Sequence, residues 1–416
     1  MITLTPYLLL LLAAIVVVII STKLRVPYTL ALVVFGVALG VFAAYTNRQD
    51  IYQGANSLLT PNLFFYILLP PIIFEAALHV NYRALRSRAP LILFLIFFGV
   101  IFTAFFAGVL VSELLGISLG IALLMSSILS PTDPIAVIDL LHRLKVPTEL
   151  STIVESESLL NDATGVILFL VILQYLAVGT ISPIRSILDF VWLAGAGVAV
   201  GGLVAVGVYL LHRRLNDPAV ETALSVAVAY GSYLLAQDIG ASGIAATAIA
   251  GIAIGTWVAP RTMAPEARSV LATFWKVVVY ISTSIIFLAM GLIFAFQDII
   301  GNLRLILVLL GALFVGRALF VYAHRPLAGF LRGKRAQLPK SWYAVLSLAG
   351  IRGAIPVALA FSLLTTQTTS ALSSSSIHTI IAVVLGVAIL SVIIGNIASE
   401  WYVRRHFQQH AAPPAA

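Results

Sequence analysis

Apolar runs of about twenty residues follow one another along almost the whole chain, with short polar links between them. A helix on such a run is long enough to cross the hydrocarbon core of a bilayer. Thirteen spans are predicted in this way, at residues 4–22, 28–45, 61–79, 90–112, 118–140, 152–175, 187–211, 220–238, 241–259, 272–296, 301–323, 341–364 and 377–400. A β-barrel is excluded, because its strands would appear as alternating segments of about ten residues. The chain is therefore predicted to be an all-α polytopic membrane protein.

Composition agrees, because hydrophobic residues make up 61% of the sequence and charged residues only 10%. The basic residues also predict the orientation. If the N-terminus lies outside, the inside links and the tail carry 18 of the 24 lysines and arginines, and the outside links carry only Arg48, Arg185 and Arg304. Basic residues gather on the cytoplasmic side. We expect a cell-membrane protein with its N-terminus outside and its C-terminus in the cytoplasm, whose net charge of +8 reflects topology and not a nucleic-acid partner.

The fifth span carries an acid between two prolines. Its residues 130–134 read Ser-Pro-Thr-Asp-Pro inside an apolar run. Each proline lacks an N–H donor and clashes with the preceding turn, so we expect the helix to break near its middle. Broken backbone at membrane depth is tolerated where it is buried in protein or lines a wet cavity, and an acid there points to function. Asp133 is therefore a candidate site residue.

The sixth span begins with a polar segment that runs straight into an apolar one. In a helix, Ser158 and Asp162 share one face, and Glu157 and Asn161 share the neighbouring face. Oxygen ligands and an ion pair can then point in different directions. Asp162 is the second candidate site residue, because it too is an acid within a membrane span.

Two later spans carry arginines that need an explanation. Arg317 lies about midway along span eleven, where an unpaired cation is costly, and Glu157 is its most economical partner because Asp133 and Asp162 then stay free for a mobile ion. Arg352 lies in span twelve, whose residues 350–356 are interrupted by glycine and proline. Interrupted spans at corresponding places of two halves indicate an inverted-repeat transporter. A packing kink is the alternative explanation for span twelve.

An acid also follows the double proline of the third span. Glu75 comes soon after Pro70 and Pro71 and lies near His79 and Arg83. It either caps or snorkels at the cytoplasmic end of its helix, or it faces the Asp133 and Asp162 cavity from a neighbouring helix. The sequence leaves both interpretations open.

In combination, these segments resemble the Na+/H+ exchanger family, in particular the NhaP/NHE-type cation/proton antiporters. The resemblance rests on residues 69–75 (LPPIIFE), 130–134 (SPTDP), 157–162 (ESLLND), 287–291 (FLAMG), 316–318 (GRA) and 350–354 (GIRGA). Each motif is weak by itself, but together and in this order they are specific. The resemblance implies a homodimer in lipid, inverted repeats with two broken crossing helices, and a core that moves like an elevator.

The resemblance also implies a division of the chain. Residues 1–400 would form one transporter unit, with core helices around 90–175 and 301–400, dimerisation helices around 1–79 and 187–259, and a linking helix around 272–296. Residues 401–416 would be a short cytoplasmic tail.

Residue by residue, the resemblance makes Asp162 the principal carrier of ion and proton and Asp133 a second carboxylate. Ser158 and the carbonyl of Thr132 would be further oxygen ligands of Na+, and Glu75 matches a glutamate that approaches the cation in some members. The remaining matched positions would support the site: Asn161, Glu157, Arg317 and Arg352. Asn161 stands where electrogenic relatives have a second aspartate, which implies electroneutral exchange.

The residue types agree with this function. A hard monovalent cation prefers carboxylate, hydroxyl and carbonyl oxygens. A carboxyl group that is shielded from water beside a second one can hold a proton near neutral pH, so Na+ and H+ can compete for one site. We therefore expect a secondary antiporter in pH homeostasis, with Na+, Li+ or K+ as the cation, no cofactor and no enzymatic activity.

Two alternatives remain. An intramembrane hydrolase of the aspartyl type would use Asp133 and Asp162 as paired acids, and composition alone does not separate a cation channel from an antiporter. A zinc enzyme is not favoured, because the seven histidines show no H-E-x-x-H spacing and there is no cysteine.

Overall fold

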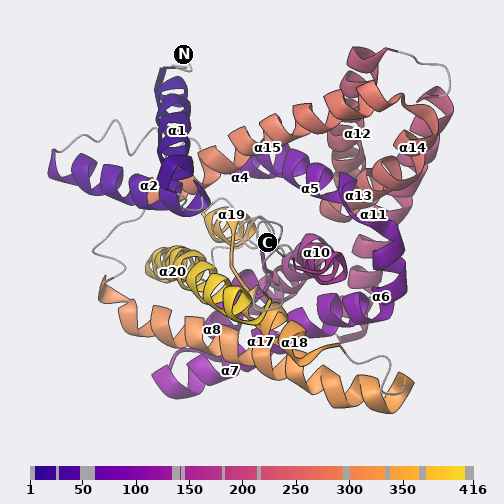
Figure 1. Ribbon diagram of the computed structural model, residues 1–416. Coiled ribbons are helices and arrows are strands. Elements are labelled where there is room, and N and C mark those ends of the chain that lie inside the picture. The colour runs from indigo at the N-terminus through magenta and orange to yellow at the C-terminus, as the bar shows by residue number, and fades with distance from the viewer. Residues whose placement is uncertain are drawn as a thin grey trace, which may run out of the picture. The chain divides into compact units, whose positions relative to one another are not determined.

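The computed structural model describes residues 5–24, 28–46, 61–133, 141, 146–179, 183–212, 217–293, 300–332, 338–364 and 372–407. Across these ranges the secondary structure is helical and no residue lies in a β-strand (Figure 1). Residues 134–140, the second half of the fifth predicted span, lie outside the described residues. The same holds for the tail after residue 407 and for several of the basic residues that predict the orientation.

The chain divides into two compact units, each made of two separate stretches of sequence. The first unit comprises Met1–Arg86 and Gly179–Phe294. Its helices are α1 (Thr5–Leu24), α2 (Tyr28–Tyr45), α4 (Pro61–Leu63), η1 (Phe64–Leu68), α5 (Leu69–Leu78), α11 (Pro183–His212), α12 (Pro218–Asp238), α13 (Gly243–Ala253), η3 (Ile254–Val258), α14 (Ala259–Thr262) and α15 (Pro265–Ile293).

The second unit comprises Ser87–Val178 and Ala295–Ala416, and α6 (Tyr82–Phe94) leads into it from the first. Its helices are η2 (Leu95–Gly99), α7 (Val100–Leu115), α8 (Leu119–Leu129), α10 (Thr148–Val178), α17 (Leu303–Arg332), α18 (Lys340–Leu348), α19 (Ala354–Ser362) and α20 (Ser374–Phe407). Residues from distant parts of the sequence therefore share one core.

Each predicted span coincides with a helix or with an interrupted helix in the described ranges. Eight of the described helices are individually long and apolar enough to cross a membrane, and shorter apolar helices cover Leu11–Ser21, Tyr28–Ala43, Phe64–Leu78 and Leu119–Leu129. The all-helical membrane fold is thus confirmed. The number of thirteen crossings stays a prediction.

The double proline of the third span is accommodated without a break in the helix. Just before it the helix widens into a π-turn at η1, whose closing hydrogen bond runs from the Leu69 N–H to the Phe64 carbonyl. Pro71 has no N–H to offer the carbonyl of Ile67, four residues earlier. The hydroxyl of Tyr230 on α12 donates to that carbonyl over 2.9 Å. A side chain of a neighbouring helix thus replaces the missing backbone donor.

Glycines let helices of the first unit approach closely. A side chain at Gly36 on α2 would overlap the Leu288 carbonyl of α15, and one at Gly291 on α15 would overlap the Val33 carbonyl of α2. Small residues at matching positions allow such close backbone contact between membrane helices. The predicted 287–291 motif therefore packs, at its glycine, against α2.

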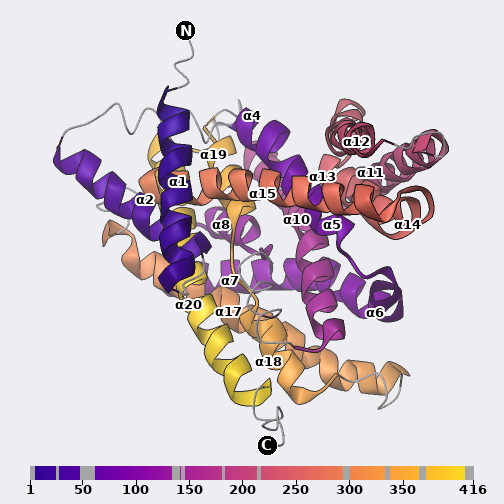
Figure 2. The same cartoon turned by 45° about the horizontal axis from the view of Figure 1, so that its top comes forward.

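The core of the second unit surrounds α20. This helix is the most buried of the eight long apolar helices, with 72% of its apolar window inside the protein, and it packs against α8, α17, α18 and α19. Figure 2 shows it beside α17 and α18. Two of these neighbours, α8 and α18, are short and end inside the unit. Their ends position the candidate site.

Candidate functional site

Two helices of the second unit are interrupted while the polypeptide continues, and we call each interruption a chain break. The first chain break, residues 130–133, follows the last turn of α8. Pro131 cannot donate to the carbonyl of Ser127, which instead accepts from the Ser130 N–H over 3.4 Å and from its hydroxyl over 3.1 Å. The proline ring is packed so tightly on α10 that Gly165 there has no room for a side chain. The break predicted in the fifth span is therefore confirmed for its described half, through Asp133.

The second chain break, residues 349–353, separates α18 from α19. Helix α18 ends at Leu348, and α19 begins after Gly353. Pro356 lies in the first turn of α19, where a helix needs no N–H donor, so the proline starts a helix here and does not kink one. The interruption expected from the glycines and the proline is thus present, and a simple packing kink is excluded.

The two chain breaks are joined by their backbones. The N–H of Asp133 donates to the carbonyl of Ile351 over 2.8 Å. The Asp133 side chain lies so close to Gly353 that any side chain at that glycine would overlap the carboxyl group. Because Gly353 is the N-cap of α19, the carboxyl group lies at the positive end of that helix. Tertiary contact therefore fixes Asp133 at the crossing point.

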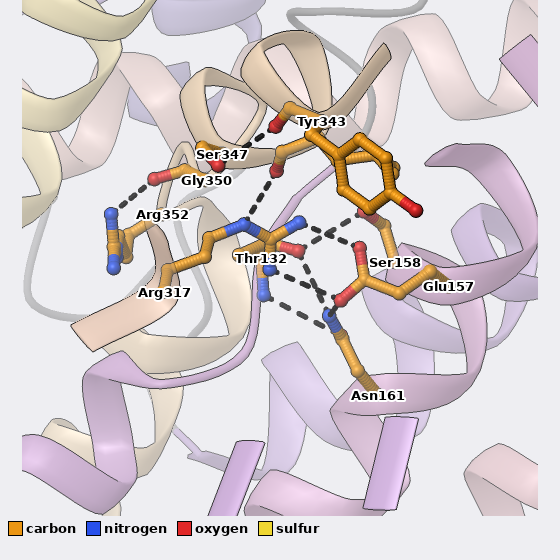
Figure 3. Close-up of polar contacts among 10 residues, drawn as sticks. Thr132, Glu157, Ser158, Asn161, Arg317, Tyr343, Ser347, Gly350 and Arg352 are labelled. Carbon is orange, nitrogen blue, oxygen red and sulfur yellow. Dashed lines mark hydrogen bonds and ion pairs between the residues drawn. The ribbon is translucent and has the colours of Figure 1, made fainter. Parts of the chain in front are cut away.

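Polar side chains of α10 bind the first chain break from the other side. The Asn161 amide donates to the Thr132 hydroxyl over 2.8 Å and to a Glu157 carboxylate oxygen over 3.0 Å (Figure 3). The hydroxyls of Thr132 and Ser158 lie 3.1 Å apart. All four residues are buried. The predicted shared face of Glu157 and Asn161 is confirmed by the hydrogen bond between them.

Glu157 also forms the predicted ion pair with Arg317 of α17. Two parallel hydrogen bonds join the groups, from Nη1 to Oε1 over 3.1 Å and from Nη2 to Oε2 over 2.8 Å. Glu157 is 1% exposed and Arg317 8% exposed, so the pair is shielded from water. The Nε of Arg317 donates to the Leu346 carbonyl in the last turn of α18 over 2.8 Å, which satisfies an otherwise orphaned acceptor.

Arg352 binds the ends of both short helices. Its Nε donates to the carbonyl of Leu129, the last residue of α8, over 3.1 Å, and its Nη1 donates to the carbonyl of Gly350. The guanidinium carbon lies 4.8 Å from the centre of the Phe314 ring. A cation is favourable at the negative end of a helix and over an aromatic face. Arg352, which is fully buried, thus ties α8 to the second chain break.

Asp162 lies on α10 next to Asn161 and is half-buried. The acids that act most strongly on its carboxyl group are Asp133 and Glu157. Arg317 binds Glu157. The carboxyl groups of Asp133 and Asp162 and the hydroxyls and carbonyls of the first chain break are the other oxygen groups at this place. Such a set of oxygen donors can bind a hard cation or hold a proton, and these described residues include no thiolate or imidazole ligand for a softer metal.

Glu75 belongs to the first unit, whereas the other predicted site residues belong to the second. Its carboxylate lies 3.4 Å from Nδ1 of His79, one turn further along α5, and Lys276 of α15 also acts on it. The proximity to His79 that the sequence suggested is therefore present. The approach of Glu75 to a bound cation remains a prediction.

Sequence reasoning missed Ser391 on α20 and Phe314 on α17. Ser391 binds the backbone of Arg352, and Phe314 lies under its guanidinium group. A lone serine or phenylalanine in an apolar span is an ordinary feature, so nothing in the sequence singles out either residue.

Comparison with known proteins supports the resemblance. The family described as sodium/hydrogen exchanger, transmembrane, matches residues 8–405. The Na(+)/H(+) antiporter ApNhaP of Aphanothece halophytica is 30% identical over 81% of this chain and 63% of its own length. The low-affinity Na(+)/H(+) antiporter NhaS1 of Synechocystis is 29% identical over 91% of this chain and 69% of its own length. This chain thus spans roughly two thirds of the length of these relatives.

A solved structure has the same fold. The sodium proton antiporter MjNhaP1 from Methanocaldococcus jannaschii superposes with a TM-score of 0.80 at 22% identity, over 95% of this chain and 96% of the other. The helical architecture with its two chain breaks, together with the family match over almost the full sequence, leads to one assignment. The chain belongs to the sodium/hydrogen exchanger family, a family of transporters and not of enzymes.

Proposed function

We propose that the protein is a secondary antiporter that exchanges Na+, or Li+ or K+, for H+ across the cell membrane. One observation carries this proposal: the Asp133 N–H donates to the Ile351 carbonyl, and the Asp133 carboxyl group lies against Gly353, so this acid lies where two chain breaks meet. The second acid, Asp162, follows Asn161, whose amide binds Thr132 of the first chain break. Na+ and H+ would compete for these two acids. The hydroxyl of Ser158 and the carbonyl of Thr132 would supply further oxygens, and Glu75 would approach the cation.

We further propose electroneutral exchange of one cation for one proton. With all acids ionised, the site carries three negative charges (Asp133, Asp162, Glu157) and two positive charges (Arg317, Arg352), a net charge of −1. Loading one Na+ brings this balance to zero, and so does loading one H+. Loading two protons would leave +1 in a low-dielectric site, which is unfavourable. An aspartate in place of Asn161 would add a further negative charge, so the neutral amide is part of the reason for this net charge.

Alternating access would move the second unit, with its site neutralised by a bound ion, and the first unit would make the homodimer contact. The N-terminus would lie outside and the C-terminus in the cytoplasm. The exposure of α11 suits this division, because only 22% of its apolar window is buried inside the protein. This arrangement is an elevator in which the site travels with its unit.

Flux in proteoliposomes tests these proposals. An outward proton gradient should drive Na+ uptake, and lowering the pH on both sides equally should raise the apparent KM for Na+, because protons compete for the same acids. A channel would instead pass Na+ without a proton gradient, and a hydrolase would pass no Na+ at all.

The stoichiometry needs a separate measurement. A membrane potential acts on moved charge at about 2.3 kcal/mol per elementary charge per 100 mV. At matched pH and Na+ concentration, an imposed K+/valinomycin potential should therefore produce no net Na+ movement in an electroneutral cycle. Sustained uptake driven by the potential would contradict the one-to-one exchange.

A further inference from the structure

The second chain break needs polar partners that its own helices cannot provide. The Ala349 N–H still donates to the Val345 carbonyl of α18, but residues 350–353 lie outside regular helix, so their N–H and C=O groups do not have partners along a helix. The N–H of Arg352 donates to the Ser391 hydroxyl oxygen over 2.9 Å. The hydroxyl proton can point to the Ala388 carbonyl, 2.8 Å away, or to the Arg352 carbonyl, 3.4 Å away. Ser391 is completely buried, so water does not substitute for it.

Ser391 is suited to this role by its place on α20. The helix continues on both sides of the residue, so its backbone groups are used within the helix and only a side chain can reach out. A hydroxyl group both accepts and donates, as this position requires. One turn later, the Ile351 side chain occupies the space that a side chain at Gly395 would need. Helix α20 thus contacts the second chain break in two ways: the Ser391 hydroxyl accepts from Arg352, and the Ile351 side chain packs on Gly395.

The segment that Ser391 holds is the one that holds Asp133. The carbonyl of Ile351, directly before Arg352, accepts the hydrogen bond from the Asp133 N–H. Gly353, directly after Arg352, lies against the Asp133 carboxyl group. Rotation of the peptide group at Arg352 would therefore move both contacts. Without the hydroxyl, the Arg352 N–H would be buried without a partner and would turn toward another acceptor.

We propose that Ser391 is a positioning residue for the cation site, which acts through the Arg352 backbone to hold the Asp133 carboxyl group in place. This inference rests on the proposed exchange of Na+ for H+ at Asp133 and Asp162. It assigns to α20 a role in cation affinity beyond the packing of the core. Ser391 does not touch the cation itself.

The test compares Ser391→Ala, Ser391→Thr and a control, Ser347→Ala, as full chains in proteoliposomes. Ser347 is also buried, but its hydroxyl donates only within α18, to the Tyr343 carbonyl over 2.8 Å. For Ser391→Ala we expect the apparent KM for Na+ to rise about tenfold, the effect of one lost buried hydrogen bond. Its kcat should stay within about twofold, because Asp162 still carries the ion.

Ser391→Thr keeps the hydroxyl and should restore the KM to within about threefold of the wild type, and Ser347→Ala should leave it unchanged. A wild-type KM in Ser391→Ala, an equal change in Ser347→Ala, or no recovery in Ser391→Thr would overturn the proposal. If the alanine variant does not fold, Ser391→Cys should give a KM for Na+ between the wild-type value and about ten times that value. A wild-type KM in Ser391→Cys would then overturn the proposal. Absence of exchange in the wild type would instead refute the antiporter function.

Discussion

The ion pair between Glu157 and Arg317 gives the sharpest quantitative prediction. Both side chains are nearly inaccessible to water, so removal of one leaves the other as an uncompensated buried charge. In soluble proteins this costs about 3–5 kcal/mol. We expect Arg317→Met to lower the free energy of unfolding by about this amount, with Glu157→Gln near the lower end of the range.

The asymmetry follows from the hydrogen bonds that each change breaks. Arg317→Met strands the Glu157 carboxylate and also the Leu346 carbonyl, which accepts from Arg317 Nε over 2.8 Å. In Glu157→Gln, the new amide oxygen can still accept from Arg317, and Asn161 keeps its bond to Thr132. The arginine change should therefore be more costly, by about 1 kcal/mol for the stranded acceptor.

A double-mutant cycle in mixed detergent micelles measures the coupling. Two charge-assisted hydrogen bonds predict a coupling energy of about 3 kcal/mol, so the double variant should be more stable than the sum of the single effects implies. The pair of Arg404 and Glu400 on α20 is a matched control, because it is exposed at 57% and 41% and should couple by no more than about 0.5 kcal/mol. Additive effects of Glu157→Gln and Arg317→Met would refute direct pairing.

Three further changes test the site and the fold. Asp162→Asn should abolish exchange while the protein stays folded, because it removes the titratable group but keeps the size of the side chain. Asp133→Asn should be similarly severe. Normal Na+ uptake by either variant would refute the site assignment. Gly353→Ala should displace the Asp133 carboxyl group and cost about 1–3 kcal/mol. Gly311→Ala, inside α17 where a side chain meets open space, should instead stabilise by up to about 1 kcal/mol in the same unfolding assay. Tyr230→Phe should lower stability by about 1 kcal/mol, because the Ile67 carbonyl loses its donor; an unchanged unfolding midpoint would contradict this.

The sequence by itself determined the helices and the residue types that meet at the candidate site. Backbone polar groups in a bilayer need partners, which only helices and closed barrels provide, and these apolar runs are too long and too continuous for barrel strands. Pro131 and the glycines at 350 and 353 fixed where two helices stop, because local chain geometry decides helix breaks. An unpaired arginine at membrane depth is costly, so Arg317 also predicted that Glu157 would be its partner.

Only the tertiary structure decided how these parts meet. The bond between Asp133 and Ile351 joins residues that are far apart in sequence, and no local preference encodes it. The same is true of Arg352, whose reach to Leu129 depends on the crossing of α8 and the second chain break. Ser391 looks like any other serine in an apolar helix until α20 packs beside that break. Orphaned backbone groups can be predicted from a proline or a glycine, but the side chain that satisfies them depends on which helix folds next to them.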